Sequence, residues 1–218
     1  MSDASDELRL FVTLKVKPEQ LATYLNAMKD EAAGARSEPD NLGFDLFEDA
    51  GDARTIYLLE HWASKAALEQ EHARQPCYIH VRGLEADALT GEFEERRLQE
   101  VEPQSPRLLQ SAKTIGGGKF RAVILKSADG DAFKLLEEAF ADLASHMRNA
   151  SGNRVFSLFR NLDNANERLF FEAWDDNDGR DQGWATAAAQ RLTTLLDASS
   201  WAEKHSIVLI DRGNDAAA

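Results

Sequence analysis

The feature that most constrains the fold of this chain is an internal repeat. Residues 44–62 read FDLFEDAGDARTIYLLEHW, residues 156–174 read FSLFRNLDNANERLFFEAW, and the two align without a gap at an offset of 112 residues. Six of the nineteen aligned positions are identical. A period this long is a whole small domain rather than a solenoid unit, whose period is about 20–50 residues. Two such halves typically pack as a pseudo-symmetric pair, in the way that two identical subunits form a dimer.

The hydrophobic pattern of the first half predicts four strands and three helical stretches. Apolar side chains alternate strictly from Leu8 to Val16, which is typical of a strand with one buried face. Apolar residues then follow helical spacing from Leu21 to about Ser37, after Pro18. The predicted elements are strand 8–17, helix 21–37, strands 42–48 and 55–62, helices 64–74 and 77–89, and strand 92–101. This order, βαββαβ, is that of a ferredoxin-like unit.

The second half repeats that order. The linker contains Pro103, Pro106 and three consecutive glycines, which indicates an irregular connection between two domains. We therefore predict a first domain at 7–102, a linker at 103–118 and a second, divergent domain at 119–213. The elements predicted in the second half are strand 119–126, a helix around 133–147, strands 154–160 and 167–174, helical stretches 184–197 and 199–204, and strand 205–212.

The fold class follows from the faces of the two predicted sheets. In a ferredoxin-like unit both helices cover one face of the sheet and the other face stays open. Phe11, Phe44, Trp62 and their counterparts are too apolar for two such faces to remain in water. We expect an α+β fold in which two tandem ferredoxin-like domains pack sheet to sheet as a pseudo-dimeric barrel of eight strands.

The composition is that of an ordinary globular protein with a marked acidic excess. The 218 residues carry 25 Lys and Arg against 38 Asp and Glu, a formal net charge of -13. Such a surface repels nucleic acid and anionic membranes. The chain has one cysteine, so an internal disulfide is impossible, and no apolar stretch approaches 18 residues. The first residues do not resemble a signal peptide, and the cytoplasm is the expected location.

Residues 42–81 resemble the antibiotic biosynthesis monooxygenase family, whose members are dimeric ferredoxin-like α/β barrels. The residues that carry this resemblance are Glu60-His61-Trp62 at the end of the third strand, the run SKAALE at 64–69, His72, and Pro76-Cys77-Tyr78. The first half matches over about 95 residues. The second half matches only in its strands and Trp174.

The resemblance implies oxygenation of quinols or similar electron-rich aromatics without a cofactor or metal. A deprotonated phenol or hydroquinone can pass an electron to O2 directly, so the protein must bind the ring in a dry pocket, assist proton removal and stabilise the anion. The expected partners are therefore a small aromatic substrate and O2. Further homodimerisation of the internal pseudo-dimer stays open.

The resemblance also suggests Trp62 and Arg82 as catalytic residues. In the family this tryptophan often lines the substrate pocket and donates its N–H, although a core aromatic would explain it equally. Arg82, twenty residues later, resembles an arginine of some polyketide-oxidising members, whereas a solvated helix arginine is the alternative. Those members also carry Asn four residues before the tryptophan, where this chain has Leu58.

Three further residues complete the candidate site. His72 is a candidate general base near neutral pH, or else a surface histidine at a helix end. Glu60 is a second candidate base, or else one member of a charge pair. Cys77 has no evident base partner, which favours a buried thiol over a nucleophile. We expect the substrate-contacting residues to be Phe11, Phe44, Glu60 and Cys77.

Other functional signals are weak. The acidic stretch 175–179 has the wrong spacing for a calcium loop, Cys77 with His72 and His80 does not form a strong zinc pattern, and the glycines of the linker do not follow a strand. The first strand lacks the asparagine of the haem-degrading relatives. An alternative function is a non-catalytic small-molecule-binding or stress-response protein. A closed apolar pocket in the first half, with polar groups converging on it, would favour the enzyme.

Overall fold

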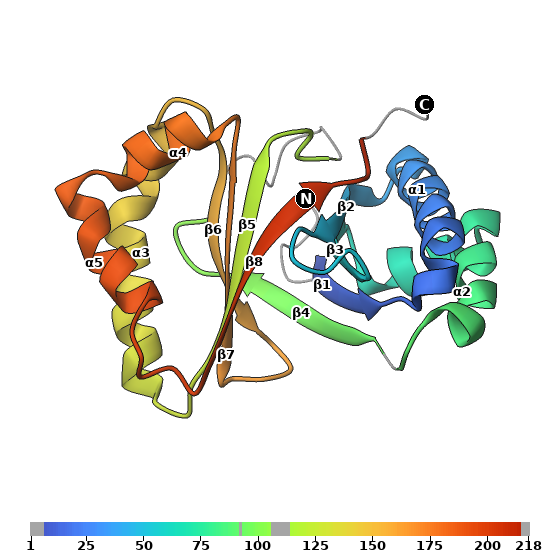
Figure 1. Cartoon of the computed structure of the whole chain (residues 1–218), viewed down its shortest axis with the longest axis horizontal. Coiled ribbons are helices and arrows are strands. Elements are labelled where there is room, and N and C mark those ends of the chain that lie inside the picture. The colour runs from blue at the N-terminus through green and yellow to red at the C-terminus, as the bar shows by residue number, and fades with distance from the viewer. Residues whose placement is uncertain (1–6, 92, 106–113, 215–218) are drawn as a thin grey trace. The chain divides into compact units, whose positions relative to one another are not determined.

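The computed structural model describes residues 7–91, 93–105 and 114–214. Its elements follow the repeated order that the sequence predicts (Figure 1). The first repeat contains β1 (Leu8–Lys15), η1 (Pro18–Gln20), α1 (Leu21–Ser37), β2 (Asn41–Asp49), β3 (Thr55–Trp62), η2 (Ala67–Glu71), η3 (His72–Arg74), α2 (Pro76–Ala88) and β4 (Glu94–Glu100). The second contains β5 (Lys119–Lys126), α3 (Gly130–Asn149), β6 (Asn153–Asn161), β7 (Glu167–Trp174), α4 (Asn177–Trp184), α5 (Ala187–Leu196) and β8 (Glu203–Asp211).

In hydrogen-bonded order the eight strands form a closed barrel, β1-β3-β2-β8-β5-β7-β6-β4. The observed pairs are antiparallel, including β1 with β3 and β5 with β7. The predicted fold class is confirmed: the chain is an α+β protein of two tandem ferredoxin-like repeats. The domain boundaries at 7–102 and 119–213 stay a prediction.

The chain forms two compact units that are not contiguous in sequence. The first contains the described residues up to 97 together with 114–116 and 210–214, and the second contains 98–105 and 117–209. The strands β4 and β8 therefore each begin in one unit and end in the other. In the first unit α1 and α2 lie on one side of β1–β3, and in the second α3, α4 and α5 lie on one side of β5–β8 (Figure 1).

The core of the first unit lies between its sheet and its helices. Leu10, Val12, Leu14 and Val16 point to this side, as their alternation predicts. Phe44 and Trp62 belong to the same core, which corrects the expectation that they share the open face with Phe11. Cross-strand register explains this, because Trp62 lies opposite Leu8 on β1, whereas Phe11 lies opposite Leu59. Phe11 is buried on the other face and stacks on Tyr57 at 5.3 Å.

The two repeats share a strand irregularity that confirms their equivalence. The register of β2 against β3 shifts between Asn41 and Gly43, and that of β6 against β7 shifts between Asn153 and Val155. The two sites are 112 residues apart, the offset of the sequence repeat. In each repeat the buried asparagine donates its side-chain amide to the carbonyl two residues later, at 3.4 and 3.3 Å. Such bulges bend a strand and strengthen its twist locally.

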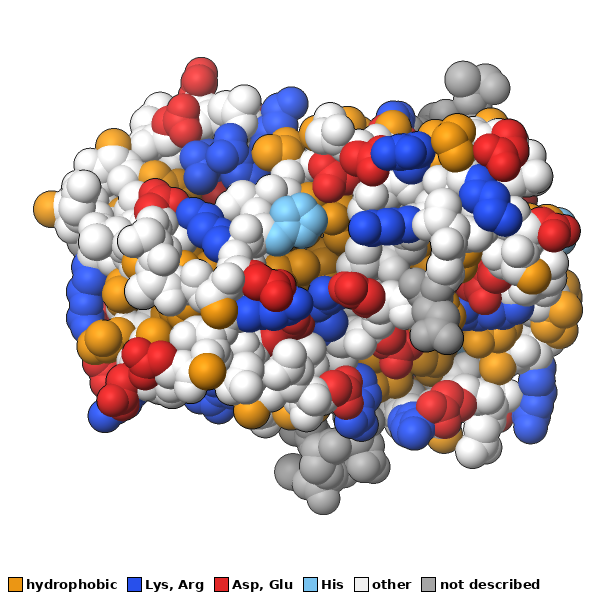
Figure 2. All heavy atoms as spheres, turned by 60° about the horizontal axis from the view of Figure 1, so that its bottom comes forward, with side chains coloured by type: hydrophobic (Ala, Val, Ile, Leu, Met, Phe, Trp, Pro, Cys, Tyr) orange, Lys and Arg blue, Asp and Glu red, His pale blue; other side chains and the backbone are white. Residues whose placement is uncertain are grey.

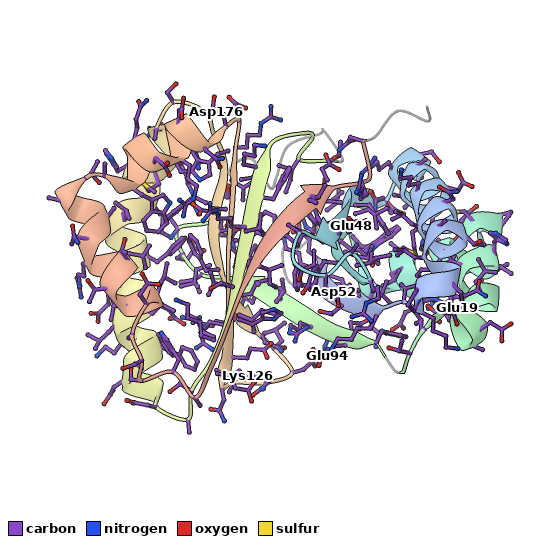
Figure 3. All side chains as sticks on the ribbon, viewed as in Figure 1. Glu19, Glu48, Asp52, Glu94, Lys126 and Asp176 are labelled. Atoms are coloured by element: carbon purple, nitrogen blue, oxygen red, sulfur yellow. The ribbon has the colours of Figure 1, made fainter. Side chains whose placement is uncertain are left out.

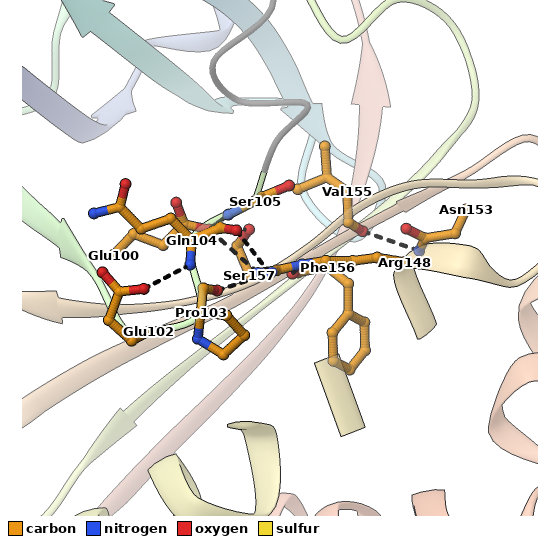
Figure 4. A network of polar contacts seen from close by, with 10 residues as sticks. All are labelled: Glu100, Glu102, Pro103, Gln104, Ser105, Arg148, Asn153, Val155, Phe156 and Ser157. Carbon is orange, nitrogen blue, oxygen red and sulfur yellow. Dashed lines mark hydrogen bonds and ion pairs between the residues drawn. The ribbon is translucent and has the colours of Figure 1, made fainter. Parts of the chain in front are cut away.

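A second shared feature ties each long helix to its neighbouring strand. In the second unit Arg148 donates Nε to the Phe156 carbonyl at 2.9 Å (Figure 4). The buried carboxylate of Glu100 lies 3.5 Å from Arg148 and accepts hydrogen bonds from Ser157 Oγ and the Ser105 backbone at 2.7 and 2.9 Å. Here the hydrogen bonds and the nearby charge offset the cost of burying a carboxylate.

The first unit contains the equivalent arginine. Arg36 donates Nε to the Phe44 carbonyl at 2.8 Å and its terminal nitrogen to the Gly213 carbonyl at 2.8 Å. Burial raises the pKa of the nearby Asp45 to about 6, although hydrogen bonds from Thr114 and Ile115 and the charge of Arg36 oppose the rise. The segment after β8 is thus held against β2 of the first unit.

The sequence-based prediction is wrong for the last helical stretch. Residues 199–202 are not helical, and β8 begins at Glu203. Trp201 instead donates its indole N–H to the Leu195 carbonyl at 2.8 Å and stacks on Phe133 at 5.5 Å. Trp201 therefore satisfies a carbonyl at the C-terminal end of α5. The predicted helical stretch 184–197 corresponds to α5, and the sequence did not predict the preceding helix α4.

The acidic stretch 175–179 forms the beginning of α4. Asp176 is the N-cap, and its carboxylate accepts a hydrogen bond from the Gly179 backbone N–H at 2.8 Å (Figure 3). An N-cap aspartate satisfies a backbone donor that the helix itself leaves unpaired. The acidic residues thus have a structural explanation.

Charged side chains of both signs are intermingled on the face shown in Figure 2. No large area of a single sign of charge is seen on this face. Among the described residues, no helix has the length and apolar character needed to cross a membrane.

Candidate active site

The first unit has a cavity of about 500 Å³ between its sheet and its helices. This volume is within the range of small-molecule sites, about 300–1,000 Å³. Aliphatic side chains from β1 form its floor, and ionisable side chains from β3, α1 and α2 converge on it. The lining residues that carry the argument are Glu31, Glu60, His72, Tyr78, Arg82 and Glu85.

Glu60 is the carboxylic acid that β3 directs into this cavity. Residues two apart on a strand share a face, so Glu60 and Trp62 both point toward the helices. The indole N–H of Trp62 donates to Glu60 Oε2 at 2.8 Å. Burial raises the pKa of Glu60 to about 7, although this hydrogen bond opposes the rise, and the negative charge of Glu31 raises it further. Near neutral pH this carboxyl group can therefore both release and accept a proton.

His72 is buried beside Glu60 and is not a surface residue. Residues 67–71 form a π-helical turn that runs directly into η3, and this irregular segment turns the imidazole inward. Its Nδ1 lies 2.6 Å from Glu38 Oε1 and its Nε2 lies 3.4 Å from Glu31 Oε1. Burial opposes a charge on the ring, but the hydrogen bonds and the charges of both carboxylates outweigh it and raise the pKa of His72. Both nitrogens are therefore occupied, as in an ion-paired imidazolium.

Arg82 contributes the cationic side of the cavity. It forms an ion pair with Glu85, and its guanidinium lies 4.7 Å from the ring centre of Tyr78 and 5.3 Å from that of Phe93. Burial lowers the pKa of Arg82, but the negative charge of Glu85 outweighs it and raises this pKa. The guanidinium is thus fixed between two aromatic rings and remains charged.

Tyr24 adds a buried hydroxyl to the cavity wall. Its hydroxyl lies near Glu85, and burial together with the negative charges of Glu85 and Glu31 raises the pKa of this hydroxyl, so Tyr24 stays protonated.

The predicted site residues divide into three groups. The cavity brings together Glu60, His72 and Arg82. Trp62 does not line the cavity but supports Glu60, and Phe44 packs edge-on against Trp62 at 6.5 Å.

The other two predicted residues lie elsewhere. Phe11 is on the opposite face of the sheet, against Tyr57. Cys77 is half-buried, burial raises the pKa of its thiol, and its Sγ would lie 2.6 Å from a Cβ added at Gly34. Its position is thus that of a packing residue between α1 and α2.

The same location in the second unit has a different chemistry. Glu172 corresponds to Glu60 in the repeat, but its Oε1 accepts from Arg180 Nε at 2.7 Å. Its Oε2 accepts from the indoles of Trp174 and Trp184 at 2.8 and 2.7 Å. The second carboxylate is therefore paired with a cation and an extra indole, whereas Glu60 forms no ion pair among the described residues and faces the larger of the two cavities. This contrast identifies the first unit as the candidate site.

Sequence reasoning missed Glu31, Tyr78 and Glu85 as cavity residues. Glu31 lies on the face of α1 that is otherwise apolar, which was a usable signal. Tyr78 and Glu85 flank Arg82 at spacings of four and three on α2, which places them on one helix face. Among the described residues, no group of three or more His, Cys, Asp and Glu could hold a metal ion.

The fold and the cavity define a ferredoxin-like α/β-barrel protein with an ionisable small-molecule pocket. The model of the antibiotic biosynthesis monooxygenase family matches residues 8–78 and 120–194, and the chain belongs to this family. The two matched regions correspond to the two repeats.

Individual relatives agree with this assignment. The "Putative monooxygenase YcnE" of Bacillus subtilis (strain 168) is 36% identical over 56 residues, which are 26% of this chain and 59% of YcnE. A crystal structure of a "putative monooxygenase" from Lactobacillus acidophilus NCFM superposes with a TM-score of 0.72 at 15% identity, covering 95% of this chain and 94% of that one. Another, from Fusobacterium nucleatum, gives 0.75 at 15% identity, with coverages of 94% and 92%. At this identity the structural likeness shows the shared fold.

Proposed function

We propose that this chain is a monooxygenase that oxidises quinols or similar electron-rich aromatics in the cavity of its first unit. The observation that carries the proposal is Glu60, a buried carboxyl with a pKa of about 7 that faces a cavity of substrate size. Membership of the monooxygenase family supports the reaction class, and the pocket chemistry supports the substrate class.

Glu60 is the proposed base for the phenolic proton. The pKa of Glu60 lies closer to that of a phenol, about 10, than the pKa of an ordinary carboxyl group does. This smaller difference favours proton transfer at neutral pH. Trp62 acts through Glu60, because its N–H is already donated to that carboxyl. It is thus a positioning residue in this proposal rather than a donor to substrate.

Arg82 is the proposed stabiliser of the phenolate. Its guanidinium lies at the cavity wall and a positive charge there lowers the energy of a developing anion. His72 pairs with Glu31 and Glu38, and its positive charge lowers the pKa of Glu60, which offsets part of the rise caused by burial. Tyr78 offers an aromatic surface for the substrate ring.

The reaction balances without a further reductant. The deprotonated ring passes one electron to O2, and the resulting radical pair combines to form a carbon–oxygen bond. Cleavage of the oxygen–oxygen bond leaves one oxygen on the ring carbon as a carbonyl and releases the other as water. The substrate loses two hydrogens and gains one oxygen, so it supplies all four electrons that O2 accepts.

The test is oxygen uptake with a panel of quinols and phenols, measured above their spontaneous oxidation. We expect turnover by the wild-type protein, with kcat/KM rising with pH through about 7 as Glu60 ionises. Glu60→Gln should lower kcat by about 10²–10⁴ and remove this pH dependence, as loss of a general base does. Arg82→Gln should lower kcat by about 10²–10³.

Two exposed residues of the first unit provide the matched controls. Glu71→Gln and Arg74→Gln make the same charge changes at exposed positions of the first unit, and both should retain wild-type rates. Absence of wild-type oxygen uptake with every substrate, or equal rates for Glu60→Gln and Glu71→Gln, would refute the proposal.

A further inference from the structure

The second unit has a cavity of its own, of about 290 Å³, beside the strands β5 and β8. It lies entirely within the second unit, because each lining residue falls between 121 and 208. Its chemistry differs from that of the first unit. The residues used below are Arg121, Phe170, Trp184, Leu196, Lys204 and Val208.

Arg121 contributes a positive charge to this cavity, and no described residue forms an ion pair with it. The side chain is half-buried on β5, and none of the described residues forms a hydrogen bond or an ion pair with it. Its cross-strand neighbour is Glu172. That carboxylate cannot compensate Arg121, because Arg180 occupies one oxygen at 2.7 Å and two indoles occupy the other.

The other charges that face the cavity cancel in pairs. Lys204 lies 2.6 Å from Asp197 Oδ1, and Arg180 lies 2.7 Å from Glu172 Oε1. Arg121 is therefore the one unbalanced charge among the lining residues. A partly buried guanidinium without a counter-charge can donate hydrogen bonds to an anion and balance its charge.

Most of the remaining lining side chains are apolar and include aromatic rings, with Thr193 and Ser206 as the uncharged polar ones. Phe170 and Trp184 meet edge-on with ring centres 6.1 Å apart, and Leu196 and Ile207 are buried. Val208 is 50% exposed although it is an aliphatic residue in a strand. A ligand that covered Val208 would remove apolar surface from water.

We propose that this second cavity binds a small monocarboxylate with an aromatic or branched apolar body. The carboxylate pairs with the guanidinium of Arg121, and the body contacts Trp184, Phe170 and Val208. A single uncompensated charge matches a monoanion better than a phosphate dianion. The volume is at the lower limit of small-molecule sites, which restricts the body to about one ring. This inference does not depend on the proposed function.

Benzoate is the probe, and its binding to the full chain is measured by calorimetry. We expect saturable binding to the wild-type protein. Benzamide has nearly the same shape without the charge and should bind at least about tenfold more weakly, since a charge-assisted hydrogen bond is about twice as strong as a neutral one. Arg121→Leu should weaken benzoate binding by about 10- to 100-fold. Arg121→Lys keeps the charge without the planar fork and should give an intermediate affinity.

The matched control is Arg191→Leu, which makes the same charge change at an exposed position on α5. This variant should bind benzoate as the wild type does. Circular dichroism establishes that each variant is folded, which is expected because Arg121 makes no described polar contact that folding requires. The inference is overturned by no saturable benzoate binding, by equal affinities for benzoate and benzamide, or by an unchanged affinity in Arg121→Leu.

Discussion

Glu60→Gln should make the protein more stable above neutral pH, although it removes a residue of the candidate site. Burial raises the pKa of Glu60 from its ordinary value of 4.5 to about 7 in the folded state. The folded state thus holds this proton more tightly than the unfolded state. The contribution to stability is fully present below pH 4.5 and is lost as the pH rises toward 7.

The size of the effect follows from the same values. A pKa difference of about 2.5, at about 1.36 kcal/mol for each pH unit, gives an order of 3 kcal/mol. Glutamine keeps an oxygen for the Trp62 indole and never ionises, so Glu60→Gln avoids the cost of a buried charge. In a protein of this size each kcal/mol changes Tm by about 2–4 °C. We expect Tm at pH 8 to rise by up to about 10 °C and to change little at pH 5.

The second repeat provides the matched comparison. Glu172→Gln is the same substitution at the equivalent position, but it deprives Arg180 of its ion pair and should lower Tm at both pH values. Thermal unfolding of the three proteins at pH 5 and pH 8 measures both effects. The reasoning is refuted if Glu60→Gln changes Tm equally at the two pH values, or lowers it at pH 8.

Two further predictions, one on packing and one on helix capping, can be checked by the same thermal unfolding experiments. Gly34→Ala should destabilise the wild-type protein by about 1–3 kcal/mol, because the new Cβ would lie 2.6 Å from the Sγ of Cys77. In a Cys77→Ala background Gly34→Ala should stabilise the protein by about 0.5–1 kcal/mol through helix propensity. If Gly34→Ala destabilised the protein in this background as well, the explanation would be contradicted. Asp176→Ala should cost about 1 kcal/mol by removing the N-cap of α4, whereas Asp176→Asn should retain most of it. Equal losses in the two Asp176 variants would argue against capping.

The repeat made most of the fold predictable from the sequence. Strands 119–126 and 167–174 have the predicted bounds, and α1 ends at Ser37 as expected. The prediction of a helix at 199–204 was wrong because the position of Trp201 is decided by its tertiary contacts with Phe133 and Leu195, which a local pattern cannot show. The faces of Phe44 and Trp62 were misjudged for a related reason. Their orientation depends on the register between strands, which the sequence of one strand does not specify.

The site was predictable only in part. The sequence identified Glu60, His72 and Arg82 as candidates, and the cavity brings these three together. The division of roles could not be predicted, because it depends on distances between separate elements. Glu31 lies on α1 and Glu38 is the C-cap residue of this helix, and together they occupy both nitrogens of His72. No sequence spacing indicates that pairing.

The exchange of strand ends between the two units has a consequence for the order of folding. The first unit contains the described residues up to 97 but also 210–214, whose backbone N–H and carbonyl groups bind Leu46 and Arg36. During synthesis the chain emerges at about 5–20 residues per second, and a domain ordinarily folds once it is released. The first unit cannot be completed in this way, because its segment 210–214 follows the whole second repeat in the sequence. The nascent first repeat must therefore wait with an unfinished sheet edge until the second repeat has been synthesised. Contacts at such sequence separation also slow folding. Completion of the first unit therefore depends on synthesis of the second repeat.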